Sequence, residues 1–145
     1  MEHLAIMNPA WKLIDKIIFG EKKIESRWYK SKRVPWNRIQ EGEVVYFKDA
    51  GKVVTAKAEV ETVLQFEQYT LEQLEEIIKK YGGKGGICFS GSYESTLAWT
   101  KDKKYCVLIF LKNAQKVEPF EIDKTGFGNA CAWICVDDIE RIKRK

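Results

Sequence analysis

The sequence lacks the features that mark membrane, secreted and repeat proteins. No apolar run approaches the roughly 20 residues that a membrane helix needs. The N-terminal residues 1–6 have neither the charged start nor the long apolar stretch of a signal peptide. No internal repeat, low-complexity tract or linker interrupts the chain. We therefore expect no membrane association, a cytoplasmic location and a single domain over residues 1–145.

Histidine and closely spaced cysteines are also scarce. With His3 as the only histidine and no CxxC pair, neither a Cys/His zinc site nor Ser–His or Cys–His catalysis is expected. Cys131 and Cys135 lie in an apolar run that reads as a strand, where four residues span about 13 Å, too far for a disulfide. Cys88 and Cys106 stand singly in apolar surroundings. We predict four buried, reduced thiols, no metal and no cofactor.

Basic residues are unevenly spread, although the net charge of the chain is only +4. Residues 22–38 contain seven basic side chains and one acid, Glu25, so this segment carries +6 and the remainder carries −2. The basic residues are Lys22, Lys23, Arg27, Lys30, Lys32, Arg33 and Arg38. A local basic patch on a slightly acidic body indicates an anionic partner that binds at one place.

The start of the chain predicts a strand followed by a helix. Residues 4–7 form a short apolar strand. Asn8 and Pro9 are residue types typical of a helix N-cap and of the first helical position. Apolar residues then recur at helical spacing up to Ile18, and Gly20 is expected to end the helix.

Strand patterns dominate the next part of the chain. Residues 23–29 predict a strand and residues 30–43 a long basic loop. Residues 44–47 form a short apolar strand, and residues 49–52 a plausible hairpin turn. Apolar and polar residues then alternate over residues 54–66, an unusual length that a curved or barrel-like sheet would accommodate.

The second half predicts a further helix and returning strands. Thr70 and Gln73 form a capping box, and Gly82 is expected to end the helix that follows it. Residues 105–111 are continuously apolar, as in a central strand buried on both faces, whereas Pro119 marks an edge strand. The apolar face of the helix is expected to comprise Leu71, Leu74, Ile77 and Ile78.

The C-terminal part completes the predicted fold. Residues 130–136 predict a last buried strand, and Asp137 is expected to cap a short helix. The basic residues 141–145 could contact a phosphate or compensate a helix dipole. We predict an α+β domain with a strongly curved mixed sheet, barrel-like in part, and two to three flanking helices.

The predicted strand over residues 23–29 carries the most informative pattern. Alternation places Lys23, Glu25, Arg27 and Tyr29 on one face, and Ile24 and Trp28 on the other. Charged residues opposite an apolar face are consistent with a polar pocket for a phosphate or a base edge. They are equally consistent with a solvated edge strand that charges protect from pairing.

The pattern Gly20-x-Lys22-x-x-Glu25-x-Arg27, followed by the strand start at residues 41–47, resembles the ASCH domain of the PUA-like superfamily. In this family a Gly-Asp pair precedes the strand, and here Glu43 stands in place of the aspartate. The resemblance implies a β-barrel-like PUA fold, a cleft lined by the motif residues Lys22, Glu25 and Arg27, and a role in RNA binding.

The resemblance also brings enzyme alternatives. Some similar proteins look like small amidohydrolases for acetylated cytidine, which use a lysine and a threonine of this motif and a later glutamate. The threonine position matches Glu25, so the nucleophile that such an enzyme needs is absent. For the ribonucleases of the family, no matching catalytic set is found. If the chain is an enzyme, Lys22 and Glu25 are the candidate catalytic residues.

Aromatic residues are interleaved with the basic ones. Trp36 is predicted to stack on a base, whereas Trp28, in phase with Ile24, is predicted to lie in the core. Both tryptophans could instead be core residues with polar rims. The residues predicted to contact RNA phosphates are Lys30, Lys32, Arg33 and Arg38.

We therefore expect a module that binds RNA or a nucleotide. The alternatives are a hydrolase for a modified nucleoside or RNA, and an interaction module for an acidic protein. Nothing in the sequence determines the oligomeric state. The residues expected to bind the ligand are Lys22, Lys23, Glu25, Arg27, Tyr29 and Trp36.

Overall fold

A curled six-stranded sheet forms the centre of the molecule in the computed structural model, which describes residues 1–87, 92–128 and 131–144. The strand order is β2-β5-β4-β3-β1-β6, and among these neighbours only the pairing of β1 with β3 is parallel. The strands are β1 (Glu2–Met7), β2 (Ile24–Tyr29), β3 (Val44–Asp49), β4 (Val54–Glu67), β5 (Tyr105–Phe120) and β6 (Trp133–Val136).

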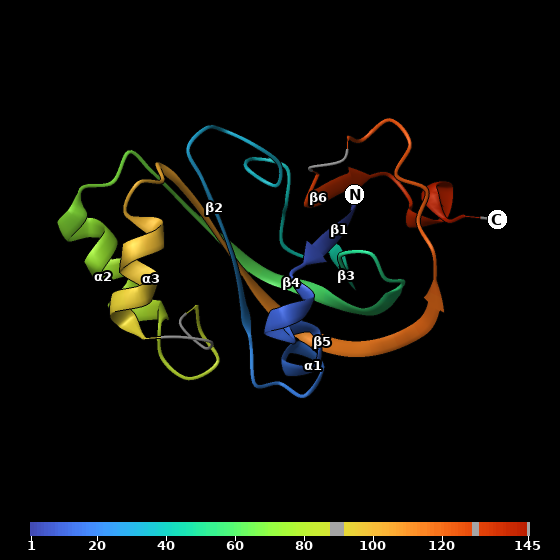
Figure 1. The fold of residues 1–145 in the computed structure, drawn as a ribbon, viewed down its shortest axis with the longest axis horizontal. Helices are drawn as coiled ribbons and strands as arrows, with labels where there is room; N and C mark the ends of the chain where they lie inside the picture. Colours follow the sequence, from blue (N-terminus) through green and yellow to red (C-terminus); the bar gives the residue numbers. More distant parts are fainter. Residues whose placement is uncertain (88–91, 129–130, 145) are drawn as a thin grey trace.

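The helices lie at separate places around this sheet. In Figure 1, α2 and α3 lie side by side at one end of the sheet, and both termini lie toward the other end. None of the described helices is long and apolar enough to cross a membrane. The helices are α1 (Leu13–Ile18), α2 (Leu71–Tyr81), α3 (Tyr93–Thr100) and the short 3-10 helices η1 (Pro9–Trp11) and η2 (Ile139–Ile142). This arrangement confirms the predicted α+β class with a curved mixed sheet.

The curvature of the sheet resides in the long antiparallel pair of β4 and β5. Three irregularities interrupt their register, and such bulges bend and twist a strand pair. Beyond Phe110, β4 is the only strand that pairs with β5 among the described residues, because β2 pairs with Tyr105 to Phe110 alone. Pro119 therefore lies on an edge, as predicted, although in the same continuous strand rather than in a separate one.

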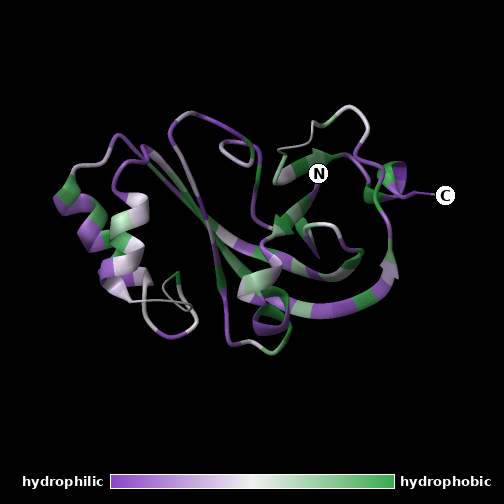
Figure 2. Cartoon of the chain, in the orientation of Figure 1, coloured by the Kyte–Doolittle hydropathy of each residue, from purple (hydrophilic) through white to green (hydrophobic). Residues whose placement is uncertain are grey.

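Two apolar clusters lie on opposite faces of the sheet, as alternation along β5 requires. Val107 and Ile109 belong to the main core with α1, whereas Cys106 and Leu108 belong to a second cluster beneath α2. This confirms the prediction of a central strand buried on both faces. Figure 2 shows hydrophobic and hydrophilic residues alternating along α2, which buries only one of its faces.

The prediction of one continuous helix after Asn8 is wrong, because the structure has two short helices, η1 and α1, in its place. Asn8 caps only η1, by accepting a hydrogen bond from the Ala10 N–H, and Lys12 then adopts a left-handed conformation with φ 54° before α1 begins. The break turns Leu13 toward the core while Trp11 stays exposed. Helical spacing of apolar residues cannot reveal a single reversal of this kind.

Several smaller predictions are corrected. Leu71 of α2 is exposed rather than buried. Asp138, not Asp137, caps the C-terminal helix, which is a 3-10 helix. Helix α3 was not predicted, because its buried residues, Thr96 and Thr100, are polar and form no apolar stripe. The capping box of α2, by contrast, is confirmed.

The cysteines are less buried than predicted. Cys106 is buried, but Cys131 and Cys135 are only half-buried, because β6 is a short edge strand that begins after Cys131. All three are free thiols. Cys88 lies outside the described residues.

His3 is fully buried in β1, and its hydrogen bonds connect this strand to β6 and to the residue before β3. The Trp133 indole N–H donates to His3 Nδ1 over 3.1 Å, so Nδ1 is an acceptor and the proton resides on Nε2. Nε2 in turn donates to Glu43 Oε1 over 2.8 Å. Glu43, the residue in place of the family's aspartate, also accepts from the Gln40 N–H and pairs with the Met1 amino group. This network fixes β1 against β6 and the start of β3.

The His3 network predicts a pH-dependent stability. Burial lowers the pKa of His3, against the smaller opposing effect of Glu43. The unfolded chain, with a histidine pKa of about 6.5, therefore takes up a proton before the folded chain does. The free energy of unfolding should therefore be highest above a pH of about 6.5 and should fall as the pH decreases below it, because protonation of His3 favours the unfolded state.

Urea unfolding at pH 7.5, 6.5 and 5.5 measures this effect for the wild type and for His3→Gln. The wild type should lose stability over this range. The variant should lose much less, since the chain has no other histidine. Parallel losses in the two proteins would show that His3 is not responsible.

Candidate functional site

The motif segment is placed by the packing of β2. Ile24 and Trp28 belong to the second apolar cluster, so Glu25 and Arg27 point to the opposite face. There Arg27 reaches β1 and the segment before β6 by donating to the carbonyls of Ile6 and Ala132, over 3.4 and 3.3 Å. The predicted alternation and the core position of Trp28 are both present in the structure.

A cavity of about 220 Å³ lies along β2, the edge strand of the sheet, and takes lining residues from both faces of the strand; we name it the motif cavity. It lies among β2, the end of β1, η1 and α3. Three of the residues that were expected to bind the ligand, Glu25, Arg27 and Tyr29, contribute to its wall. The lining residues are Ile6, Met7, Asn8, Trp11, Leu13, Glu25, Ser26, Arg27, Trp28, Tyr29 and Trp99.

One carboxylate oxygen of Glu25 is an open acceptor beside this cavity, in the sense that nothing in the described part of the chain donates a hydrogen bond to it. The residue is 5% exposed, and its Oε1 lies 3.3 Å from Arg27 Nε. Its Oε2 is buried and has no hydrogen-bond partner in the described part of the chain. Because Oε2 is covered in the free protein, a ligand reaches it only when the surrounding side chains move, and a hydrogen bond donated there would then remove the cost of a buried polar atom without a partner.

Arg27 is already engaged by the protein. Besides its two carbonyl acceptors and Glu25, its guanidinium lies over the Trp133 ring, 5.1 Å from the centroid. These contacts hold the side chain in one place and set the position of the Glu25 carboxylate. Arg27 therefore acts mainly on Glu25, and less as a free group for an incoming phosphate.

Lys22 lies behind the motif cavity rather than on its wall. It is 3% exposed, and its ammonium donates to the Ile24 carbonyl. Burial lowers the pKa of Lys22, and the nearby Glu25 charge opposes this effect. Lys23, just before β2, is exposed, and its N–H donates to the Gly85 carbonyl. Neither lysine lines the motif cavity.

A second cavity of about 250 Å³ adjoins the first, and we name it the basic cleft. It shares Trp28 and Tyr29 with the motif cavity. Lys30 pairs with Asp102 over 3.3 Å, but both side chains are more than half exposed, so the pair is weak. The lining residues are Trp28, Tyr29, Lys30, Ser31, Arg33 and Lys103.

Other residues of the predicted basic loop lie outside both cavities. Trp36 is half-buried against the main core, with an edge contact to Tyr105 at 5.2 Å between ring centroids. Lys32 lies 4.0 Å from Glu67 and above the ring of Tyr105. Arg38 lies beside Met1, toward the N-terminus. The structure thus separates the loop into a part at the cleft and a part against the core.

The sequence did not reveal two tryptophans of the motif cavity. Trp11 of η1 is 52% exposed and Trp99 of α3 is 47% exposed, and both contribute to the cavity wall. Trp99 also meets Trp28 edge to face, with ring centroids 6.1 Å apart. The only available signal was the count of five tryptophans, which does not say which of them are exposed.

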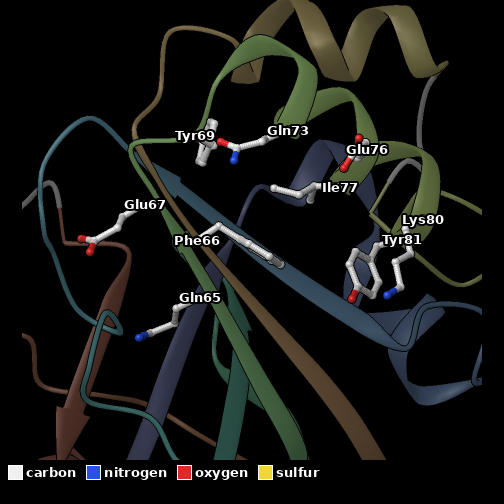
Figure 3. Close-up of a pocket in the computed structure, with 9 residues that line it drawn as sticks. All are labelled: Gln65, Phe66, Glu67, Tyr69, Gln73, Glu76, Ile77, Lys80 and Tyr81. Atoms are coloured by element: carbon white, nitrogen blue, oxygen red, sulfur yellow. The ribbon is translucent and has the colours of Figure 1, made fainter.

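A larger cavity of about 430 Å³ lies elsewhere, between the end of β4 and α2. Figure 3 shows Phe66 and Ile77 near its middle, with Tyr69 and Gln73 toward one end and Tyr81 toward the other. Two acids and one lysine, Glu67, Glu76 and Lys80, are its charged lining residues. This charge does not favour a polyanion, and none of the residues expected from the sequence to bind the ligand lines the cavity.

Within the described residues, no group of His, Cys, Asp and Glu has the arrangement of a metal site. No protein-family model and no curated protein sequence matches the chain.

Solved structures do resemble it. The crystal structure of an ASCH protein from Zymomonas mobilis has 15% sequence identity and a TM-score of 0.64, covering 97% of this chain and 90% of that one. A single-substitution mutant of the same protein has 16% identity and a TM-score of 0.68, covering 97% and 93%. At such low identities the likeness concerns the fold alone, and by that measure the chain shares the fold of this ASCH protein.

Proposed function

We propose that the chain binds single-stranded RNA or a nucleotide through the motif cavity and the basic cleft. The observation that carries this proposal is that the two cavities share two lining residues, Trp28 and Tyr29. One cavity has a carboxylate oxygen without a hydrogen-bond partner beside its wall and exposed indole rings on it, and the other offers cations. A nucleotide needs both, because its base stacks and hydrogen-bonds while its phosphate carries charge.

Each residue then has a defined role. Glu25 accepts a hydrogen bond from the base, and Arg27 holds Glu25 in position. Trp11 and Trp99 offer faces for stacking. Lys30, Arg33 and Lys103 attract phosphates, in agreement with their place in the basic cleft. Lys22 lies outside the cavity wall, and neither Trp36 nor Lys32 lines either cavity.

The Glu25 carboxylate also favours certain bases. An ionised carboxylate only accepts hydrogen bonds, and the amino group of cytosine is a donor that acidic side chains recognise. Uracil has no amino group. We infer a preference for cytidine over uridine at the motif cavity, because only cytidine presents this donor to the open Oε2 atom.

The base preference gives the first binding test. Glu25→Gln keeps the shape of the side chain but replaces one acceptor by a donor. It should remove about 1–3 kcal/mol of discrimination between oligocytidine and oligouridine, measured by fluorescence titration at low salt. Glu61→Gln, an exposed glutamate on β4, is the matched control and should keep the discrimination. An unchanged ratio of affinities in Glu25→Gln would refute the role of Glu25.

The exposed tryptophans give the second test. Trp11→Ala or Trp99→Ala should each weaken oligocytidine binding by about 1–3 kcal/mol if the ring stacks on a base. Circular dichroism checks that the fold is intact. Phe19→Ala, which removes an exposed aromatic ring outside both cavities, should bind like the wild type. Normal affinity in both tryptophan variants would rule out stacking at the motif cavity.

A hydrolase for a modified nucleoside is the second candidate function. The observation in its favour is the buried Lys22, whose pKa is lowered and whose ammonium lies near Glu25. A lysine with a lowered pKa can take part in proton transfer near neutral pH. The hydrolase predicts release of acetate from acetylated cytidine by the wild type and none by Lys22→Met in its folded form. If the wild type binds oligocytidine but releases no acetate, the hydrolase is refuted and only the binding function is supported.

A further inference from the structure

A third cavity of about 250 Å³ lies beside the turn between β3 and β4, and we name it the Lys48 pocket. It shares no residue with the motif cavity or the basic cleft. Its wall comes from the hairpin turn, the segment after β5 and the C-terminal segment. The lining residues are Lys48, Gly51, Lys52, Val53, Glu121, Ile122 and Arg144.

Lys48 is an unusual residue in this wall. It follows the irregularity between Phe47 and Lys48 in β3, and it is only 8% exposed. In the described part of the chain it has no ion pair and no side-chain hydrogen bond. Burial lowers its pKa, and the charge of the nearby Lys124 acts in the same direction. The side chain is thus largely covered while its ammonium stays accessible at the pocket without an ionic partner, and a bound anion would supply that partner.

The other charged groups of the pocket are mostly cations. Lys52 and Arg144 line it together with Lys48, and Glu121 is its one acidic lining residue. The carboxylate of Glu121 lies 3.7 Å from Arg144, and both side chains are 60% exposed, so this pair is weak and easily rearranged. The balance of charge therefore favours an anion.

The backbone holds the cationic groups in place. Arg144 N–H donates to the Glu121 carbonyl and Asp123 N–H donates to the Ile142 carbonyl, over 2.9 and 2.8 Å. These bonds fix the C-terminal segment against the end of β5. On the other side, Lys52 N–H closes the turn by donating to the Asp49 carbonyl. The pocket is thus built from three segments that hydrogen bonds hold in place.

We propose that the Lys48 pocket binds an anion of the phosphate class, either free phosphate or a phosphate group of a nucleic acid. Lys48 supplies an ammonium that has no ionic partner in the described part of the chain, and Lys52 and Arg144 supply further donors at the rim. The volume of the pocket exceeds that of one phosphate, so a sugar or a second group can accompany it. This site is independent of the motif cavity and stands whether or not the chain binds RNA there.

Thermal unfolding tests the proposal. The Tm is measured in potassium phosphate and in potassium chloride at the same ionic strength. The wild-type Tm should rise by about 3–6 °C at a phosphate concentration tenfold above Kd. Lys48→Met should abolish this rise and should be about as stable as the wild type without phosphate, because it keeps an apolar stem of similar length and removes only the ammonium. Lys112→Met, which changes an exposed lysine on β5, should keep the rise.

Two further arms make the result decisive. Arg144→Gln, at an exposed position, should reduce the phosphate effect even if Lys48→Met fails to fold. A dinucleoside monophosphate, whose only phosphate is a diester, replaces inorganic phosphate in the second arm. A rise in Tm that depends on Lys48 with either probe supports the site and identifies the source of its phosphate. No rise with either probe, or an equal rise in Lys48→Met, overturns the proposal.

Discussion

The register between β2 and β5 is the constraint on which the proposed site depends. It pairs Ile24 with Phe110 and Trp28 with Cys106, so one face of β2 closes the apolar cluster beneath α2. Successive side chains of a strand point to opposite faces, and Glu25 and Arg27 must therefore point toward β1. A shift of one residue would force both charges into the apolar cluster, which makes this register strongly preferred.

Burial of the Glu25–Arg27 pair explains how the site keeps an open acceptor. Arg27 contacts two backbone carbonyls and the Trp133 ring, so its position is set by β1 and by the segment before β6. Glu25 is held by Arg27 at one oxygen only. The His3 network fixes β1 from the other side, since it ties this strand to Trp133 and Glu43. The geometry of the motif cavity thus depends on side chains that never reach its wall.

Local features of the fold could be predicted from the sequence. The alternation in β2, that in β4 as far as Val60, and the capping box of α2 depend on neighbouring residues, and the structure contains them. Beyond the irregularity after Val60, Leu64 and Phe66 pack in the second apolar cluster, so the alternation predicted for residues 54–66 is wrong there. The break at Lys12 and helix α3 could not be predicted, because no local apolar period marks them. The same two elements bring Trp11 and Trp99 to the motif cavity, and so the aromatic part of the site was missed.

The basic residues, too, could be predicted from the sequence only in part. The basic loop was evident from composition, but only the structure separates Arg33, at the cleft, from Lys32, which lies over Tyr105. Lys103 completes the cleft from a distant part of the chain. Lys48 gave no sequence signal at all, since a lysine in a short strand is ordinarily exposed and its burial depends on the C-terminal segment packing against the hairpin.

The salt dependence of oligocytidine binding tests the central claim most directly. For a single strand, the logarithm of the association constant should fall with the logarithm of salt concentration by about 0.7 per phosphate contact. The account predicts measurable binding at low salt and a steep slope, which Arg33→Gln combined with Lys103→Gln reduces by about 1.4 if each contacts one phosphate. No binding at low salt, or a slope that this double variant leaves unchanged, would contradict it.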